Sequence, residues 1–541
     1  MYMKHIKFNL WLLFAICALT GISGCQKFLD RQPLKATLDD LNTGKLEAQV
    51  LNMYSQMRSA GAFATLPWVD FHSIRGDDAA KGSDINDGGE VVTEFDTYQY
   101  SKDDWAPNDY WNGHYTMINT TNNAIATYIE DSIANPGVTI QPATYRNIGE
   151  ACFFRAFAYF DLVKTYGDVP LFNFPLITPA DGLVDRTPSA RIYEFIDSNL
   201  AVAAALCPMS SDEYGSKYPG RITRGAANTL WAQTYLFRKQ WDKVVALTNE
   251  VIASGKYSLL PEFSDIWKDG LGGEGKNSAE SIFEAQATVG QGGASNESVR
   301  FGSAWGTCQQ VRQNGASSDW NLGWGWNVPT ESLVADWPDD DPRKSKTILY
   351  SGEFDGGPEL GGHGLTIPEY TNPDGTGGLA QKYWNKKLYT GNSPAMLSFT
   401  GYTRLPDGAS WINHRILRYA DVILMLAEAS NELGDGGTAE ANLELIRDRA
   451  SGGLGAARSI VPKIAFAGQE QMRQAIKDER RWEFALEGYR FYDLVRWDDA
   501  LEVLGPLGYT NRARFYPIPQ QAIDLTAPEG GEPILKQNPE W

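Results

Sequence analysis

The feature that most constrains the fold of this chain is a helical periodicity that recurs along much of its length. In one long example, apolar residues recur at three- and four-residue steps between Ile148 and Leu162, and Gly167 follows. Such a stripe is typical of a helix that buries one face, and a glycine just beyond it commonly ends the helix. We therefore predict a helix that ends before Gly167.

Two further stripes lie so close together that they predict a helix pair. One runs over residues 227–235 and the other over 241–252, and little more than Lys239-Gln240 separates them. A connection this short forces two consecutive helices to pack antiparallel. The sequence therefore predicts a compact helical hairpin at this position.

The same arrangement returns in the last third of the sequence. A stripe over residues 419–433 stops at Gly434, and Thr438 is placed to cap a second helix over 439–450. Two more helices are expected, over residues 470–486 and 489–504. Paired helices of this size resemble tetratricopeptide units, whose period is about 34 residues. The periodicity thus predicts a mainly α-helical scaffold built from helix pairs.

Two long stretches break the helical pattern. Residues 61–115 and 265–410 are rich in Gly, Asn, Asp, Trp and Pro, and only Ser281 to Gln286 has the character of a short strand. Extended loops on a rigid scaffold are where binding residues usually gather. We therefore expect a loop-rich face that carries the function.

The N-terminal segment has the pattern of an export signal. Lys4 and Lys7 precede an apolar run over residues 10–19, which is too short to span a bilayer, since that needs roughly 20 residues. The run leads to Ile22-Ser23-Gly24-Cys25, which resembles a bacterial lipobox. We predict a signal peptide over 1–24, a lipid on Cys25 for membrane anchoring, a tether over 25–41 and a single domain over 42–541. An ordinary signal peptide with an incidental cysteine is the alternative.

The charge and the cysteines exclude some classes of protein. The chain has 48 basic and 67 acidic residues, and removing Lys4 and Lys7 with the signal leaves 46 minus 67, or −21. Such a charge repels phosphate backbones, so no nucleic acid partner is expected. The predicted mature domain keeps Cys152, Cys207 and Cys308. Three is an odd number, so a complete disulfide framework is excluded, and Cys152 is expected to be a buried thiol.

Motifs for catalysis are scarce. The histidines lack the one-turn spacing of a zinc protease, and no Gly-x-Ser-x-Gly motif occurs. The charges from Glu479 to Glu483 are expected to form ion pairs on a helix surface. We expect a protein that is not an enzyme. A pair of carboxylates that hydrolyses glycosides stays open, because their separation is a spatial property.

One acidic cluster offers hard oxygen ligands for a cation. It comprises Asp77, Asp78, Asp84, Asp87 and Glu90. Carboxylate oxygens suit Ca²⁺, but the spacing of an EF-hand is absent. A solvated loop is the alternative that we favour, and no other cofactor is expected.

Aromatic residues in the second loop-rich stretch indicate a ligand platform. Trp305, Trp320 and Trp324 are spaced by glycine and accompanied by Arg312 and Asn314. The apolar face of a sugar ring stacks on indole, while amides and guanidinium groups hydrogen-bond the hydroxyls. Arg312 could equally hold a carboxylate. The alternative is that some of these tryptophans belong to the core.

Several short segments along the chain carry a family pattern. They are Gly149 to Leu162 with Tyr166 to Leu171, Trp111 with Tyr115, Ile118 and Asn122, Arg418 to Val422, Leu426 to Ala429, Glu479 to Phe484, Glu487 to Trp497, Tyr516 to Pro519, and Gln537 to Pro539. In their order along the chain, and over essentially the whole mature chain, they resemble the SusD/RagB family of outer-membrane nutrient-binding lipoproteins. The lipobox also stands where the family has it.

The resemblance implies both a fold and a function. The fold is a SusD-like α/α superhelix of about four tetratricopeptide-like helix pairs with an irregular, loop-rich ligand-binding face. The function is capture of oligosaccharide or peptide on the exterior of the Bacteroidetes outer membrane, for import through a SusC-type TonB-dependent transporter. Asp77 and Trp105 occupy the part of the chain that contributes to the ligand face in relatives, so we add them to the expected ligand-binding residues.

Overall fold

The structure is a computed structural model. It describes residues 46–58, 66–84, 87, 89–137, 140–215, 219–270, 273–288, 302–313, 320–357, 360–391, 410–452 and 460–541. The expected signal peptide, the lipidation site Cys25 and the candidate ligand residue Asn314 therefore lie outside the described residues.

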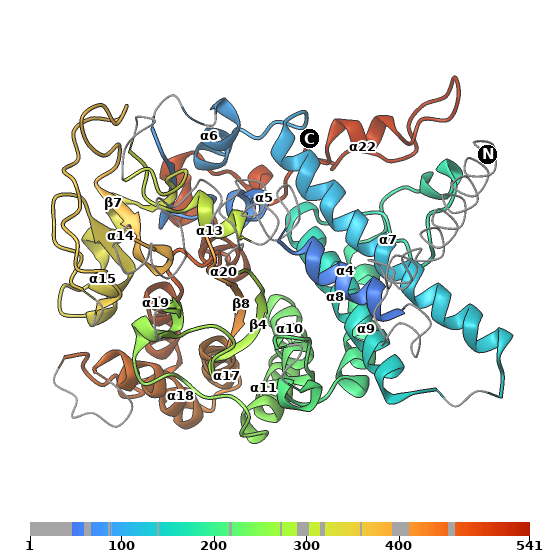
Figure 1. Ribbon diagram of the computed structural model, residues 1–541, viewed down its shortest axis with the longest axis horizontal. Coiled ribbons are helices and arrows are strands. Elements are labelled where there is room, and N and C mark those ends of the chain that lie inside the picture. Colours follow the sequence, from blue (N-terminus) through green and yellow to red (C-terminus); the bar gives the residue numbers. More distant parts are fainter. Residues whose placement is uncertain are drawn as a thin grey trace, which may run out of the picture.

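Long helices make up the scaffold and pack in pairs along the chain (Figure 1). The pairs are α4 (Leu46–Gln56) with α7 (Trp105–Ala134), α8 (Pro142–Tyr166) with α9 (Ser189–Leu206), α10 (Arg224–Phe237) with α11 (Trp241–Ala253), and α17 (Tyr419–Glu432) with α18 (Gly436–Ala450). Helix α11 also packs on α17, which joins two pairs that are far apart in sequence. The expected mainly α-helical architecture of helix pairs is confirmed.

Helix α8 shows how the sequence pattern produces this packing. From Asn147 onward nearly every residue of the helix is buried, because α7, α9 and α4 all pack against it. The helix ends at Gly167, whose φ of 75° lies in the left-handed region that glycine enters without a steric penalty. The predicted helix end before Gly167 is confirmed.

The rest of the chain adds one further long helix and many short elements. The long helix is α19 (Gln469–Phe484), which packs on α17 and α18. The shorter helices are α5 (Leu66–Val69), α6 (Gly89–Thr97), α13 (Ala304–Cys308), α14 (Glu331–Asp336), α15 (Pro342–Thr347), α20 (Arg490–Trp497), α21 (Ala500–Leu504) and α22 (Gln520–Asp524). Single turns occur at η1 (Asp70–Ile74), η2 (Pro179–Gly182), η3 (Ser211–Tyr214), η4 (Phe263–Trp267), η6 (Lys386–Leu388), η7 (Gly505–Leu507) and η8 (Asn511–Arg514).

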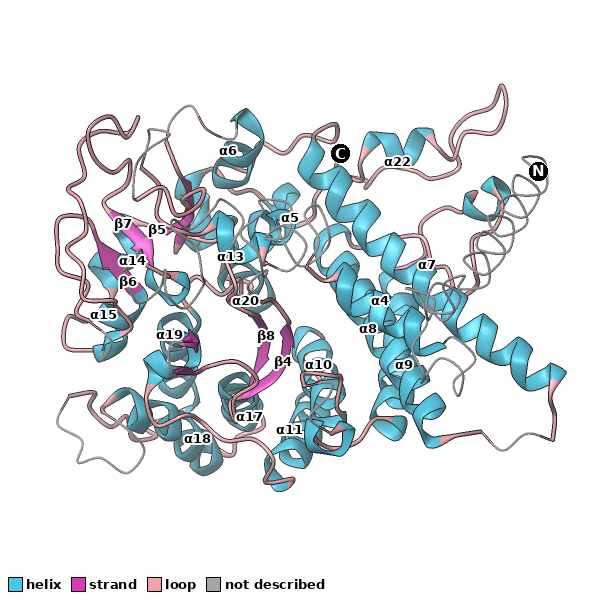
Figure 2. Ribbon diagram, viewed as in Figure 1, coloured by secondary structure: helices cyan, strands magenta, loops and turns pink. Residues whose placement is uncertain are grey.

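The described strands form two-stranded antiparallel ribbons, most of them on the loop-rich side opposite α7 to α9 (Figure 2). They pair β1 (Ala79–Gly82) with β5 (Trp326–Pro329), β2 (Asp269–Gly270) with β3 (Gly273–Glu274), β4 (Ser281–Ala285) with β8 (His414–Arg418), and β6 (Ile348–Tyr350) with β7 (Tyr383–Asn385). The predicted strand near Ser281 is confirmed as β4. In the first ribbon Ala80 lies opposite Val328, which brings the two loop-rich stretches together.

Three local predictions need correction. The cap of α18 is Asp435, whose carboxylate accepts a hydrogen bond from the backbone N–H of Thr438, so the helix starts two residues before Thr438. The helix predicted over 489–504 is two helices, α20 and α21, because Asp498 adopts a left-handed φ of 68° between them. Residues 105–115 belong to α7, so the first loop-rich stretch is shorter than expected.

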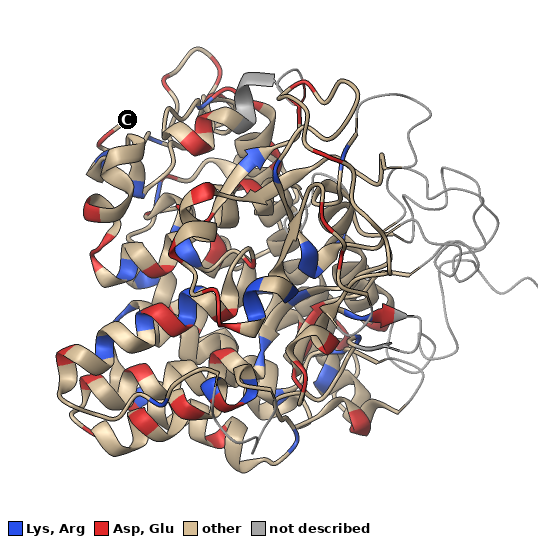
Figure 3. Ribbon diagram, turned by 90° about the vertical axis from the view of Figure 1, so that its left-hand side faces the viewer, with Lys and Arg blue, Asp and Glu red and all other residues tan. Residues whose placement is uncertain are grey.

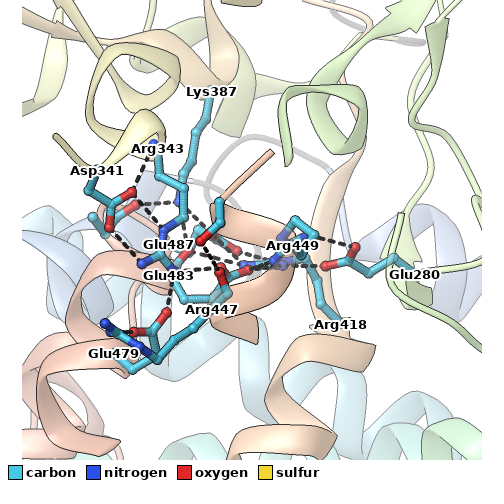
Figure 4. Close-up of polar contacts among 12 residues, drawn as sticks. Glu280, Asp341, Arg343, Lys387, Arg418, Arg447, Arg449, Glu479, Glu483 and Glu487 are labelled. Carbon is cyan, nitrogen blue, oxygen red and sulfur yellow. Dashed lines mark hydrogen bonds and ion pairs between the residues drawn. The ribbon is translucent and has the colours of Figure 1, made fainter. Parts of the chain in front are cut away.

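The charges of α19 form ion pairs as predicted, but their expected place on the surface is wrong. Glu479, Arg480 and Glu483 are buried, because α15, η6 and β8 bring their own charged residues onto the helix (Figure 4). Arginines of two of these elements, Arg343 and Arg418, both contact Glu483. Elsewhere, acidic and basic residues are interspersed along the helices (Figure 3).

The core and its thiols agree with the sequence. Cys152, Cys207 and Cys308 are free and buried, and burial raises the pKa of each thiol. Tyr516 and Ile518 are fully buried in the main hydrophobic cluster. None of the helices in the described part of the chain combines the length and apolar character needed to cross a membrane.

Candidate ligand-binding site

The acidic segment that follows η1 divides into two groups with different partners. The first is Asp77 and Asp78, which are buried against the C-terminal helices. Arg490 donates to Asp77 through Nε at 2.7 Å and Nη2 at 3.0 Å, and Arg481 donates to Asp78 through Nε at 2.7 Å. These contacts tie the segment to α19 and α20.

The environment of this pair separates the pKa values of its two carboxyls. Burial raises the pKa of Asp77, but the hydrogen bonds and charge of Arg490 outweigh it, so the pKa lies below its ordinary value. Burial together with the Asp77 charge raises the pKa of Asp78 above its ordinary value. Both oxygens of Asp77 are engaged, so in this arrangement Asp77 is an internal anchor.

The second group surrounds Arg312. Its guanidinium forms ion pairs with Asp87 at 2.5 Å and with Asp84 at 3.2 Å. Ser83 donates its hydroxyl to the same Asp87 oxygen at 2.6 Å, and the indole N–H of Trp326 lies 3.4 Å from that oxygen. We call Asp84, Asp87, Arg312, Trp324 and Trp326 the Arg312 cluster.

Two tryptophans give this cluster an aromatic wall. Trp324 is half-buried, Trp326 is buried, and their rings meet edge-on with centroids 5.6 Å apart. Gly325 between them has a φ of +73°, and a Cβ there would lie 2.9 Å from Cβ of Arg312. The glycine therefore lets the backbone carrying the two rings approach Arg312 closely. Trp320 is also half-buried and packs on the neighbouring hydrophobic cluster of Val311 and Trp384.

The remaining candidate residues lie in other places. Trp305 is 4 % exposed and stacks on His414 with centroids 4.0 Å apart, so its ring face is covered within the core. Trp105 is 38 % exposed at the first turn of α7. The structure thus brings Arg312 together with Asp84 and Asp87, and Trp324 adjoins them through Trp326. Asp77 contacts Arg490 and Trp305 contacts His414, while Trp105 lies at the start of α7.

Sequence reasoning missed two members of this surface. Lys81 donates through Nζ to the backbone carbonyls of Asp84 and Asp87, and burial lowers its pKa despite the nearby carboxylates. Gln381 donates through Nε2 to the carbonyl of Ser83 at 2.6 Å. Lys81 lies within the acidic segment but is itself basic, so a search for acidic ligands passed over it. No sequence signal would have found Gln381, which is 298 residues from Ser83.

The acidic residues do not form a cation site in the described part of the chain. No group of three or more potential ligands gathers there. Asp84 and Asp87 face Arg312, and Asp77 and Asp78 face Arg481 and Arg490. The guanidinium beside each carboxylate repels a second positive charge. We expected these carboxylates to lie in a solvated loop, but they form ion pairs within the protein.

Comparison with known proteins assigns this helical scaffold to the class of SusD-type proteins. A family model described as "SusD family" matches residues 279–513, and one described as "Starch-binding associating with outer membrane" matches residues 27–236. Together the two matches span most of the chain, including the first loop-rich stretch and the second from residue 279 onward. This chain belongs to the SusD family.

Individual relatives agree over nearly the full length. A "SusD-like protein P2" of Formosa agariphila is 25 % identical over 502 residues, covering 90 % of each chain. A "SusD-like protein" of Bacteroides ovatus is 25 % identical over 527 residues, covering 90 % of this chain and 80 % of the relative.

Solved structures share the fold. A "Laminarin binding SusD-like protein" has a TM-score of 0.70 at 24 % identity and covers 92 % of this chain and 100 % of its own. The "Surface glycan-binding protein A from Bacteroides thetaiotaomicron in complex with laminarihexaose" has a TM-score of 0.68 at 20 % identity, covering 92 % and 99 %. At these identities the likeness establishes the architecture, including the expected SusD-like superhelix.

Proposed function

We propose that this protein is a cell-surface glycan-binding lipoprotein, which captures an oligosaccharide and delivers it to a SusC-type TonB-dependent transporter. The observation that carries the proposal is the half-buried Trp324, whose ring meets Trp326, while the indole N–H of Trp326 lies 3.4 Å from the Asp87 oxygen that pairs with Arg312. An indole surface next to donors and acceptors of fixed direction is what a pyranose ring requires. Family membership and the laminarin-binding structural neighbour support this ligand class.

Each residue of the site has a specific role in this proposal. Trp324 and Trp320 stack on sugar rings, Arg312 donates to hydroxyls, and Asn314 contributes from the segment between them. Trp105 extends the surface through an exposed ring. Asp77 and Trp305, which we also predicted as ligand contacts, are buried, so a direct contact would require neighbouring side chains to move. Binding of Ca²⁺ would require a carboxylate of the acidic segment to separate from the arginine with which it forms an ion pair.

The proposed location is the exterior of the outer membrane, with an acyl anchor on Cys25. It is supported by the lipobox-like Ile22 to Cys25 and by the family description that mentions association with the outer membrane. Labelling with radioactive palmitate, compared between the wild type and Cys25→Ala, tests the anchor. Incorporation by the variant would contradict it.

Two other functions are possible alternatives, and each would require a different chemistry at the site. A peptide-binding protein of the RagB type would use backbone pairing and side-chain pockets, and would not depend on Trp324. A surface glycoside hydrolase would release reducing ends from a bound polysaccharide, whereas we propose binding without catalysis. Arg312 forms ion pairs with both Asp84 and Asp87, so in this arrangement both carboxylates are already engaged by a cation.

The test is native affinity electrophoresis of the chain from residue 26, through gels that hold different polysaccharides. We expect one polymer to retard the wild type, and Trp324→Ala and Trp320→Ala to abolish the retardation. The matched control is Trp241→Ala, because Trp241 is a half-buried tryptophan of the scaffold helix α11. Retardation that survives in the Trp324 and Trp320 variants would refute the proposed surface, and retardation by no polymer would favour peptide capture.

A further inference from the structure

A groove that shares no residue with the Arg312 cluster lies beside the end of α6. One wall is the segment from Thr97 to Tyr100, and the other is the segment from Gly508 to Ala513. The ring of Trp541 lies at the groove, whose volume is about 460 Å³. That volume falls within the range of roughly 300–1,000 Å³ that is usual for small-molecule sites.

The second wall presents a cation held by an aromatic ring. The guanidinium of Arg512 lies 3.6 Å from the ring centroid of Trp541, and that ring stacks in turn on Tyr100. The indole N–H of Trp541 donates to the carbonyl of Phe515 at 3.1 Å, which fixes the ring. Arg512 is exposed, and none of the described carboxylates forms an ion pair with it. Its hydrogen-bonding edge therefore has no anionic partner within the described protein.

A second cation lies directly behind the groove. Arg75 is fully buried, and it donates through Nε to the hydroxyl of Tyr100 and through Nη2 to the carbonyl of Ala513, both at 2.8 Å. Tyr100 and Ala513 both line the groove. Among the described residues, Nη1 of Arg75 has no hydrogen-bond partner. A buried charge without a counter-ion is costly, and a nearby anion would offset that cost.

Several other buried arginines have a carboxylate partner, which Arg75 lacks among the described residues. Arg343, Arg418 and Arg496 each pair with at least one carboxylate, whereas the amide oxygens of Asn199 and Asn122 accept from Arg155. The acidic groups nearest the groove do not replace such a partner. Asp77 and Asp96, whose charges reach Tyr98, are engaged by Arg490 and by the backbone N–H of Lys81, and Glu540 is exposed. The lining of the groove itself holds Arg512 and no aspartate or glutamate, on a chain whose net charge is −19.

We infer that this groove binds an anionic saccharide unit, whose carboxylate or sulfate group accepts hydrogen bonds from Arg512. A guanidinium fork matches the geometry of an oxyanion, and such charge-assisted bonds are stronger than neutral ones. Gln99 and Thr510, which are exposed on opposite walls, supply hydrogen bonds to the hydroxyls of the sugar. The saccharide class rests on the proposed function, whereas the preference for an anion rests on Arg512 and Arg75.

The experiment is isothermal titration calorimetry of the mature chain with three probes: trigalacturonate, a sulfated galactose trisaccharide, and neutral galactotriose. The test variant is Arg512→Gln. The matched control is Arg514→Gln, which removes the same charge from an exposed arginine two residues away that does not line the groove. We expect the test variant to weaken binding of one anionic probe at least about tenfold, as loss of a charged hydrogen bond does, and the control to change it less than about twofold.

Each other outcome overturns a stated part of the inference. Equal losses in both variants would indicate general charge attraction, and equal affinity of the wild type for the anionic and neutral probes would remove the anion preference. Inorganic sulfate that binds as tightly as the sulfated trisaccharide would mean a free-anion site.

The titrations are repeated in Trp324→Ala. Anionic binding that persists there while neutral binding is lost separates this groove from the Arg312 cluster, and absence of neutral binding in the wild type would count only against the proposed function.

Discussion

Arg418 and Glu483 face each other in the protein interior, with Nη1 of the arginine 3.0 Å from Oε1 of the glutamate and side-chain exposures of 1 % and 0 %. Arg418 ends β8 and Glu483 lies in the last turn of α19. Arg449 of α18 and Arg343 of α15 approach the same carboxylate. Although burial opposes ionisation, these cations hold the pKa of Glu483 well below its usual range. The pair thus joins the helical scaffold to the loop-rich part of the protein.

Replacing Arg418 should therefore destabilise the fold strongly. Arg418→Met would leave the buried carboxylates of Glu280, Glu483 and Glu487 without one of their cations. Breaking a buried pair from one side typically costs about 3–5 kcal/mol. Urea denaturation followed by circular dichroism measures the free energy of unfolding. The control is Arg473→Met, because Arg473 pairs with Glu432 and Glu470 at a half-exposed position where about 1 kcal/mol or less is expected. Equal losses in the two variants would contradict the prediction.

Asp77 provides a test of anchoring against ligand contact. If its main task is to hold Arg490 and Arg481, Asp77→Asn should lower the free energy of unfolding by about 1–3 kcal/mol. The affinity of the folded protein for its glycan should then stay within about twofold, because a twofold change is well below the cost of one lost hydrogen bond. Thermal unfolding and affinity electrophoresis on the same preparation separate the two effects. A large loss of affinity at unchanged stability would instead support the predicted direct contact.

Asp96 should make stability depend on pH. It accepts the backbone N–H of Lys81, and burial raises its pKa from 3.8 to about 7. A raised pKa means that the folded protein holds this proton more tightly than the unfolded chain. The stabilising contribution is therefore complete below about pH 4 and disappears as the pH rises through 7, at about 1.4 kcal/mol per unit of pKa difference.

The variant Asp96→Asn removes this titration. Free energies of unfolding measured at pH 4.5, 6 and 8 should fall more steeply with rising pH in the wild type than in the variant. Parallel profiles for the two proteins would show that Asp96 does not titrate in this range.

Gly325 should be needed for the shape of the Arg312 cluster. Gly325→Ala combines a φ of +73° with a Cβ 2.9 Å from both Arg312 Cβ and Trp384 Cζ3. We expect a destabilisation of about 1–3 kcal/mol and weaker glycan binding, because Arg312 must shift. Gly364→Ala is the control, since its φ is +77° but nothing lies within 4 Å of the added Cβ. Thermal unfolding and electrophoresis compare the two, and unchanged binding in Gly325→Ala would show that the close approach is not required.

The errors of the sequence analysis have a common physical origin. The charged residues from Glu479 to Glu483 were predicted to lie on a solvated helix face. Their spacing indicates that they lie on one helix, but not which other elements pack against it. Their partners Arg343 and Arg418 come from 136 and 65 residues away. Trp305 and Trp324 likewise belong to similar glycine-spaced runs, yet His414 covers Trp305 while Trp324 remains half-buried. Which tryptophan is covered depends on elements that are distant in sequence.

The sequence by itself determined the helical scaffold, the family and the segments from which the candidate site is built. Those properties depend on periodicity, capping and short-range motifs, which act between residues within a few turns of one another. Only the tertiary structure decided that Asp84 and Asp87 meet Arg312, that the charges of α19 are buried, and that Arg75 and Arg512 meet at one groove. Ion pairs and burial depend on distances of a few ångströms between elements that lie hundreds of residues apart in the sequence. Local sequence patterns do not specify those distances.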